Sequence, residues 1–196
     1  MAVGVLALQG DFEAHKKALE DAGAEVRLVR DAEGVRACDG LVIPGGESTT
    51  LWKLMEGTGI EDAIRELARS RPVFGTCAGA ILLARDVTNP ERKGMGLLDA
   101  TVERNAYGRQ LDSSVVKLDD LDTRVLGAEP LEAVFIRAPR FRAVGPGVEV
   151  LARRDGSPVL VRQGNVVAAT FHPELTNDRR VLELFLSGVA RSRRAA

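Results

Sequence analysis

The chain has 196 residues, of which 45% are hydrophobic and 28% are charged, and its formal net charge is -1. A chain of this size and composition can bury a core without disulfides or metal ions, as soluble globular proteins do. The near balance of 27 basic and 28 acidic side chains excludes a global basic field that would attract nucleic acid or an anionic membrane.

Short apolar runs alternate with amphipathic stretches over the first 85 residues. The apolar runs predict strands at residues 3–8, 25–29, 40–43 and 72–75. The stretches between and after them predict helices at residues 12–22, 48–55, 60–68 and 78–84. Gly23 is expected to end the first helix, and Ser48 is expected to cap the second. Strands and helices that take turns indicate parallel strands joined by helical crossovers.

The second half of the chain has a different pattern. Residues 86–113 contain an Asn-Pro pair, glycines and many charges, which predicts a loop with short strands. Further strands are predicted at residues 115–118, 133–137, 148–152, 159–162 and 166–171, with a hairpin turn at 163–165. A last helix follows Asn177 and Asp178. Its inward-facing residues are expected to be Val181, Leu182, Phe185 and Val189.

No internal repeat, low-complexity segment or linker divides the chain. We therefore expect an α/β fold with a single domain over residues 1–196. It would contain an open, mostly parallel sheet flanked by helices, with an added strand-rich second half.

The two cysteines, Cys38 and Cys77, bear on where the protein acts. No secretory signal precedes the first predicted strand, and the first apolar run is too short to span a membrane. This pattern favours a cytoplasmic protein with two free thiols. Cys38 lies just before a predicted strand, where packing or partial exposure is the expected role.

The segment Gly75-Thr76-Cys77-Ala78-Gly79 joins a predicted strand to a predicted helix. Its Gly-x-Cys-x-Gly pattern is the thiol counterpart of the Gly-x-Ser-x-Gly turn that presents a nucleophile at a strand end. The turn is sharp, so its flanking residues must be small. The free N–H groups and partial positive charge of the helix N-terminus favour a thiolate and can hold an oxyanion. A buried structural cysteine at a tight turn is the alternative interpretation of this segment.

A cysteine nucleophile requires a base, and the chain has two histidines, His15 and His172. His15 lies in the first predicted helix beside two lysines, where we expect it to face solvent or a helix end. His172 follows a predicted strand and is followed two residues later by Glu174. Catalytic groups of open α/β sheets gather at the carboxyl ends of strands, and a nearby carboxylate can fix the tautomer of a histidine. We therefore predict that His172 is the base and Glu174 its orienting carboxylate; the alternative is a loop histidine.

A second small-residue turn, Pro44-Gly45-Gly46-Glu47-Ser48-Thr49, also joins a predicted strand to a predicted helix. Its glycines leave backbone N–H groups open to an anion or a carbonyl oxygen. The turn lacks the Gly-Lys-Ser/Thr ending of a Walker loop, so it is a candidate oxyanion hole or substrate clamp opposite Cys77. The few cysteines and histidines are widely separated along the chain, and no metal site is predicted.

Together these motifs resemble the triad-type glutamine amidotransferases, through the Gly75–Gly79 turn and through His172-Pro173-Glu174. The resemblance implies the class I amidotransferase fold. Within that group the chain resembles most closely the glutaminase subunits of pyridoxal 5'-phosphate synthases. The segments that carry this closer resemblance are residues 6–15, 44–50, 103–110 and 135–139, and the likeness extends from residue 3 to about 187.

The resemblance implies that Cys77 attacks the side-chain amide of L-glutamine, that His172 shuttles the proton to the leaving ammonia, and that Glu174 orients His172. It also implies that backbone N–H groups of Gly46 and Ala78 hold the oxyanion. The residues that match glutamine contacts of the family are Gly46, Glu47, Ser48, Arg104, Ile136 and Arg137. A cation such as Arg104 or Arg137 suits the α-carboxylate of glutamine.

The resemblance supplies a partner and no cofactor. The partner is a synthase subunit with a (β/α)8 barrel, which would use the ammonia to make pyridoxal 5'-phosphate. Three alternatives remain: the glutaminase subunit of another amidotransferase, such as imidazole glycerol phosphate synthase; a cysteine hydrolase or peptidase that works alone; and a non-catalytic interaction module.

Overall fold

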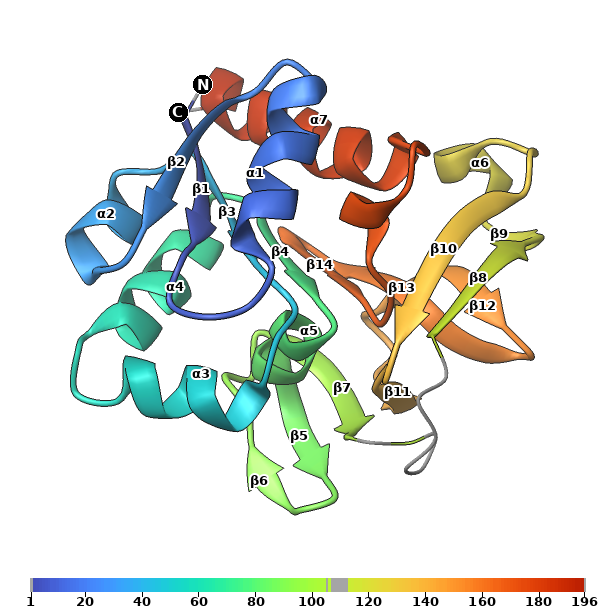
Figure 1. Ribbon diagram of the computed structural model, residues 1–196, viewed down its shortest axis with the longest axis horizontal. Helices are drawn as coiled ribbons and strands as arrows, with labels where there is room; N and C mark the ends of the chain where they lie inside the picture. Colours follow the sequence, from blue (N-terminus) through green and yellow to red (C-terminus); the bar gives the residue numbers. More distant parts are fainter. Residues whose placement is uncertain (1, 105, 107–112, 196) are drawn as a thin grey trace.

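The computed structural model describes residues 2–104, 106 and 113–195, and within them eight strands form one large sheet. The strand order is β2-β1-β3-β4-β14-β13-β12-β9 (Figure 1). The first five of these strands pair in parallel, and the last three continue the sheet in antiparallel pairings. The predicted open, mostly parallel sheet of an α/β protein is confirmed.

The parallel part of the sheet contains the strands predicted from the first half of the chain. They are β1 (Ala2–Leu6), β2 (Glu25–Val29), β3 (Gly40–Ile43) and β4 (Val73–Thr76), joined by β14 (Val166–Ala169) from the far end of the sequence. Because β14 lies directly beside β4, residues that follow Ala169 reach the same sheet edge as residues that follow Thr76. This pairing positions the site described below.

The antiparallel part begins with the predicted hairpin. Strand β13 (Ser157–Gln163) turns through Gly164 and Asn165 into β14, and Gln163 pairs with Val166. Strands β12 (Glu149–Arg154) and β9 (Asp120–Leu121) complete the sheet. Gly164 has φ 55°, a left-handed conformation that glycine adopts without strain.

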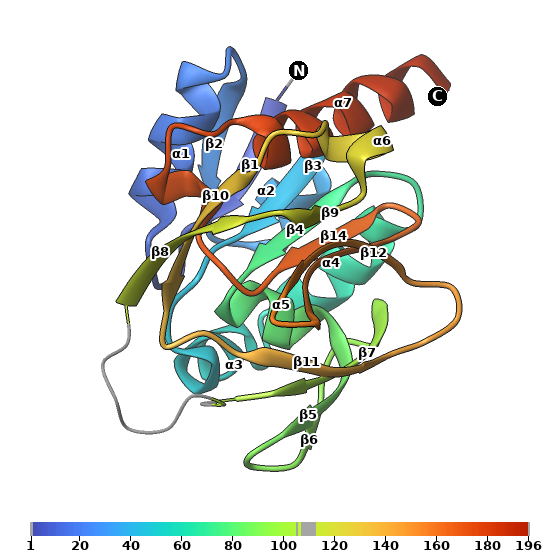
Figure 2. The ribbon, with the colours of Figure 1, turned by 90° about the vertical axis from the view of Figure 1, so that its right-hand side faces the viewer.

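Helices cover both faces of the sheet (Figure 2). On one face lie α1 (Phe12–Asp21) and α7 (Arg180–Ala195), together with strand β10 (Leu131–Ile136). On the other face lie α3 (Ser48–Met55), α4 (Ile60–Ala68) and α5 (Ala78–Leu83). The inward-facing residues predicted for the last helix are all buried.

Strand β3 shows how one strand serves both faces. Leu41 and Ile43 belong to the hydrophobic cluster under α3, α4 and α5, whereas Val42 belongs to the cluster under α1 and α7. All three side chains are fully buried. Successive side chains of a strand point to opposite faces, so a strand covered on both sides is apolar throughout.

Two small sheets hold the strands of the middle segment, and most of them were not predicted individually. Strands β11 (Arg140–Val144), β7 (Leu98–Glu103), β5 (Ala84–Thr88) and β6 (Arg92–Lys93) form one, in that order. Strand β8 (Ser113–Leu118) pairs with β10 in the other.

One local expectation needs correction. The cap of α3 is Glu47 rather than Ser48, because the Glu47 carboxylate accepts hydrogen bonds from the backbone N–H groups of Thr49 and Thr50 at 2.9 and 2.7 Å. Two short helices, α2 (Ala32–Arg36) and α6 (Thr123–Leu126), were not predicted. Within the described residues, the structure contains no helix of the length and apolarity needed to cross a membrane.

Candidate active site

Cys77 lies at the turn between β4 and α5, in the strained conformation expected of a nucleophile-bearing turn. Its φ of 48° and ψ of -103° are unusual for a residue with a side chain. Its backbone N–H donates to the Ala169 carbonyl at 2.8 Å, which ties the turn to β14. A Cβ atom on Gly79 would lie 2.1 Å from the Ile43 carbonyl oxygen, and one on Gly75 would lie 2.6 Å from the Gly79 backbone. Both flanking glycines are therefore required by close packing.

His172 and Glu174 lie at the same sheet edge as Cys77. His172 follows β14, and its backbone N–H donates to the Val134 carbonyl of β10 at 2.8 Å. Glu174 belongs to the short 3-10 helix η1 (Pro173–Leu175), and its Oε1 lies 2.7 Å from Nδ1 of His172. Cys77 acts on the same ring, because the interaction with its side chain contributes to raising the pKa of His172. The structure thus brings the three predicted residues into one chain of contacts.

The electrostatics of this chain favour charge separation. Burial alone lowers the pKa of His172, but hydrogen bonds to Cys77 and Glu174 and the Glu174 charge outweigh it, so this pKa lies well above its ordinary value. Burial alone raises the pKa of Glu174, but the interactions with His15 and His172 outweigh it and hold the pKa below its ordinary value. The arrangement therefore holds an ionised carboxylate against an imidazole that binds its proton firmly.

Gly45, in the turn after β3, lies against one side of the group formed by Cys77, His172 and Glu174. A Cβ atom on Gly45 would lie 2.5 Å from Cε1 of His172 and 3.3 Å from Cβ of Cys77. The backbone of this turn therefore passes directly over the histidine ring and the cysteine. Only glycine leaves room for that approach.

A pocket of about 90 Å³ opens in front of Cys77. Its lining includes all six residues predicted to contact a substrate, which are Gly46, Glu47, Ser48, Arg104, Ile136 and Arg137. Ile81 and Pro139 also line the pocket and were not predicted. The predicted segment 103–110 is described only at residues 103, 104 and 106; its other residues lie outside the described part of the chain.

The Glu47 carboxylate is half exposed, but its oxygens are engaged by neighbouring groups. It caps α3, accepts a hydrogen bond from Oγ1 of Thr50, and lies 3.2 Å from Nη2 of Arg104. Partial burial opposes its charge, but the hydrogen bonds from Thr50 and Thr49 prevail and lower the pKa of Glu47 to about 2. The same Arg104 nitrogen donates to Oγ1 of Thr49 at 3.0 Å. Glu47 thus joins the start of α3 to the arginine that lines the pocket.

Comparison with known proteins adds the family. The sequence profile of the SNO glutamine amidotransferase family matches residues 5–191. This chain belongs to that family. The pyridoxal 5'-phosphate synthase subunit PdxT of Koribacter versatilis is 58% identical over 189 residues, which cover 96% of each chain. The protein of the same name from a strain of Thermus thermophilus is 54% identical over 190 residues, which cover 94% of this chain and 95% of the relative.

Solved structures agree with this membership. A crystal structure described as a glutamine amidotransferase is 51% identical and superimposes with a TM-score of 0.87, covering 96% of this chain and 98% of the other. PurLQS from Thermotoga maritima superimposes with a TM-score of 0.70 over 95% of this chain and 97% of the other. At 19% identity the second likeness concerns the fold alone.

His15 does not lie where the sequence of this amidotransferase suggested. The expectation of a solvent-facing histidine in α1 is wrong, because His15 is fully buried together with Ala18 and Leu19. Spacings of three and four residues place these three side chains on one face of the helix, and that periodicity was the signal that could have revealed the burial.

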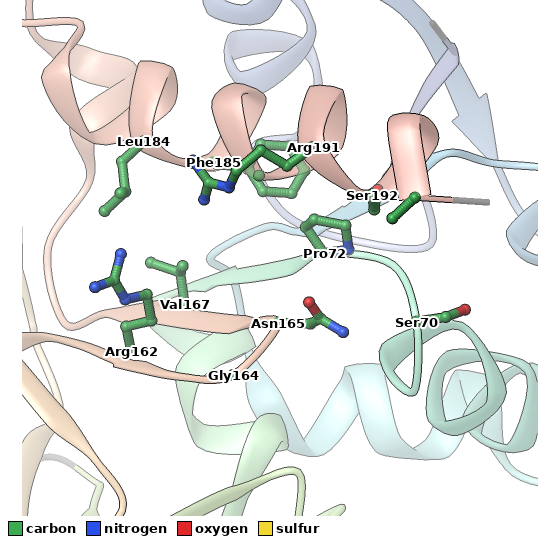
Figure 3. A pocket seen from close by; sticks show the side chains of 12 residues that line it. Ser70, Pro72, Arg162, Gly164, Asn165, Val167, Leu184, Phe185, Arg191 and Ser192 are labelled. Atoms are coloured by element: carbon green, nitrogen blue, oxygen red, sulfur yellow. The ribbon is translucent and has the colours of Figure 1, made fainter.

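A larger hollow of about 300 Å³ lies at the opposite edge of the sheet, between α7 and the β13–β14 hairpin (Figure 3). Its apolar lining comes from residues such as Pro72, Val167 and Phe185, with Arg162 and Arg191 at its sides. Its described lining includes no cysteine, histidine or carboxylate, so it offers no nucleophile or base. Over the described part of the chain, no three Cys, His, Asp or Glu side chains are grouped to hold a metal ion.

Proposed function

We propose that this chain is the glutaminase subunit of a pyridoxal 5'-phosphate synthase. It hydrolyses L-glutamine to L-glutamate and ammonia, and it delivers the ammonia to a synthase subunit. The observation that carries the proposal is the combination of the buried Cys77–His172–Glu174 chain with relatives of that name at 54–58% identity over nearly the full length.

The reaction begins with the Cys77 thiolate, whose proton is held by His172. The sulfur attacks the side-chain carbonyl carbon of glutamine and forms a tetrahedral intermediate. His172 gives its proton to the departing nitrogen, the carbon–nitrogen bond breaks, and ammonia leaves a glutamyl thioester on Cys77. Water then attacks the thioester while His172 takes its proton, and the carbon–sulfur bond breaks to release glutamate. Glu174 acts throughout by holding Nδ1 of His172 at 2.7 Å.

The tetrahedral oxyanion needs hydrogen-bond donors fixed in place beforehand. Ala78 is the first residue of α5, where a backbone N–H has no acceptor within its own helix. Gly46 lines the pocket opposite and has φ 155°, outside the range that residues with side chains readily adopt. The backbone N–H groups of Ala78 and Gly46 are therefore the proposed oxyanion donors.

The rest of glutamine binds in the pocket lined by the predicted contact residues. Arg104 and Arg137 are its two cations, and either can pair with the α-carboxylate. The Glu47 side chain is engaged by Thr49, Thr50 and Arg104, so Glu47 contributes chiefly by holding Arg104 and through its backbone. Ile136 supplies an apolar wall.

The partner is a synthase subunit, for which we propose a (β/α)8 barrel, and neither nucleic acid nor a membrane takes part. We further propose that residues 1–196 act as one glutaminase domain in the cytoplasm. Support for that compartment comes from the chemistry, since both cysteines are free and a nucleophilic Cys77 must stay reduced.

The test measures glutamate release from glutamine by the purified chain, with and without the pyridoxal 5'-phosphate synthase subunit. We expect slow release by the chain alone, a severalfold rise with the partner, and loss of release in Cys77→Ala. Cys38→Ala is the matched control and should retain the wild-type rate. Activity that survives Cys77→Ala would overturn the mechanism. Activation by the synthase subunit of imidazole glycerol phosphate synthase instead would leave the glutaminase activity supported. It would overturn the assignment to pyridoxal 5'-phosphate synthesis.

A further inference from the structure

A second histidine lies directly behind the catalytic residues. The ring of His15 is fully buried, with Nε2 2.9 Å from Oγ1 of Thr76 and 3.3 Å from Oε1 of Glu174. Oε1 of Glu174 is also the atom that contacts Nδ1 of His172. One carboxylate oxygen therefore lies between two imidazole rings, one on each side.

The surroundings of His15 identify which ring nitrogen carries a proton. Nδ1 of His15 is buried and has no hydrogen-bond partner among the described residues. A tautomer with its N–H at Nδ1 would bury an unpaired donor and would aim the Nε2 lone pair at the Glu174 carboxylate. With the N–H at Nε2, the ring instead donates toward Oε1 of Glu174 and Oγ1 of Thr76, both of which can accept. The second arrangement is the favourable one.

A polar ring at a fully buried position needs a reason, because an apolar side chain would fill the same space without desolvation. Glu174 supplies that reason. Its other oxygen, Oε2, is buried and has no hydrogen-bond partner among the described residues, so Oε1 carries the contacts that compensate for burial of the charge. Removing His15 would leave His172 as the one described side chain that stabilises this carboxylate.

We propose that His15 is a positioning residue of the active site: it donates from Nε2 to Glu174, and so fixes the carboxylate that orients His172. It also contacts Thr76, the residue immediately before Cys77, so one ring connects both ends of the catalytic chain. The inference rests on the proposed glutaminase function for its link to catalysis. The contribution of His15 to the lowered pKa of Glu174 agrees with it.

The test compares two replacements of His15 in the complex with the synthase subunit. His15→Phe keeps a ring of similar size and removes the donor, whereas His15→Gln keeps a side-chain N–H that can reach the same acceptors. For His15→Phe we expect kcat for glutamine hydrolysis to fall by about 10- to 100-fold. Losses of this size are typical when a group that orients a metal-binding histidine is removed from an enzyme, and His15 would orient the catalytic residues in a similar way. KM should change less than about twofold, because the pocket in front of Cys77 is untouched. His15→Gln should recover most of the lost kcat.

A double variant separates positioning from simple packing. In a Glu174→Gln background, His15→Phe should have less than about a twofold further effect on kcat, because the residue through which it acts is already gone. Losses that multiply in the double variant would overturn the proposal. So would an unchanged kcat in His15→Phe accompanied by a lower urea midpoint.

Two further measurements keep the inference testable apart from the glutaminase assay. The rate at which iodoacetamide alkylates Cys77, followed by mass spectrometry of the peptide that contains it, reports on the Cys77–His172 pair whatever the substrate is. We expect this rate to fall in His15→Phe and in Glu174→Gln alike. If the wild-type chain hydrolyses no glutamine, the proposed function fails, and this rate still decides the role of His15.

The second measurement needs no variant of His15, in case His15→Phe does not fold. The chain has two histidines, so the nitrogen-15 imidazole spectrum of the untagged protein contains signals from His15 and His172 alone. We expect a His15 proton on Nε2 whose signal shifts in Glu174→Gln. A proton on Nδ1 of His15, with a lone pair on Nε2, would overturn the proposal.

Discussion

The two cysteines occupy opposite edges of the same sheet; both are buried free thiols, but their neighbours differ. Cys38 precedes β3 at the amino edge, is 1% exposed, and its Sγ donates to the Gly34 carbonyl at 3.1 Å. Cys77 follows β4 at the carboxyl edge, is 9% exposed, and interacts with His172, whose pKa it raises. Burial raises the pKa of the Cys38 thiol above its ordinary value.

This difference teaches that a mostly buried thiol can react where a base and an open pocket lie beside it. Cys38 is enclosed by packed side chains and faces a carbonyl oxygen, which accepts a hydrogen bond but cannot remove the proton. Cys77 faces an imidazole that can hold its proton, at the start of a helix and beside an open pocket. Variants that remove or exchange these features one at a time test the comparison.

The largest effect is expected from His172→Asn, which takes the proposed base away from Cys77. We expect kcat/KM for glutamine to fall on the order of 10⁶-fold, as when a triad histidine is removed elsewhere. Alkylation of Cys77 by iodoacetamide should also become much slower than in the wild type. Cys38→Ala, assayed in parallel, should leave the turnover unchanged. Rapid alkylation of Cys77 without His172 would contradict the role assigned to the histidine.

The second prediction compares two glycines, each of which packs closely against the surroundings of one cysteine. A Cβ atom on Gly45 would lie 2.5 Å from the His172 ring, and a Cβ atom on Gly4 would lie 2.5 Å from Sγ of Cys38. Gly45→Ala should displace the ring and reduce kcat by about 100-fold, because a shift near 1 Å costs that much in a positioned site. Gly4→Ala should leave kcat unchanged and reduce the free energy of unfolding by about 1–3 kcal/mol through overpacking.

Urea unfolding of the two glycine variants measures the change in stability, and steady-state kinetics measures the change in kcat. If Gly4→Ala slows catalysis in the folded protein, the claim that the two sheet edges have separate roles is wrong. It also fails if Gly45→Ala leaves kcat within twofold of the wild type.

The third prediction concerns stability at low pH. The folded protein lowers the pKa of Glu174 below its ordinary value of 4.5, so the ionised carboxylate stabilises the fold above pH 4.5, and this stabilisation disappears as the pH falls. The raised pKa of His172 acts in the opposite direction. Its contribution is complete below its ordinary value of 6.5 and is lost as the pH rises through the raised value.

The measurement is the difference in unfolding free energy between the wild type and Glu174→Gln. It should be about 2 kcal/mol near pH 6, which is typical of a hydrogen bond to a charged group, and should shrink below pH 4.5. A difference that stays constant from about pH 6 to about pH 3 would show that the Glu174 carboxylate is not charged in the folded protein.

The smallest effect is expected at Cys38. Cys38→Ala removes one buried sulfur and should reduce the free energy of unfolding by about 1 kcal/mol, with kcat and KM unchanged. In the native wild type, Cys38 should react with iodoacetamide only as fast as the protein unfolds. Labelling of Cys38 that is faster than unfolding would place it outside the packed core.

Much of the fold could be predicted because its signals are local. Strand β3 and helices α3 and α4 have the predicted bounds, since each is a local apolar or amphipathic run with glycine or proline near its ends. The small sheets were harder because strand pairing is not local. Strand β11 pairs with β7, which lies far from it in the sequence, and its run Arg140–Val144 alternates poorly between apolar and polar side chains.

The residues of the site divide in the same way, into those with local sequence signals and those that depend on distant partners. Cys77, His172 and Glu174 could be proposed from motifs in which neighbouring residues carry the information, and the structure places them in contact. The ion pair of Glu47 with Arg104 and the contacts of His15 depend on distant partners. Arg104 follows β7, and His15 reaches residues of β4 and η1. No nearby sequence feature reports such contacts.

The pairing of β4 with β14 has a consequence for engineering this protein. Thr76 is paired with Ala169, and the Cys77 N–H donates to the Ala169 carbonyl, so the separation of Cys77 and His172 is set from a strand end that lies three residues before the histidine. Segments at the amino edge can therefore be shortened, lengthened or exchanged without changing that separation. One residue inserted between Ala169 and His172 would shift the histidine relative to this strand end, and with it the hydrogen bond from its backbone N–H to the Val134 carbonyl.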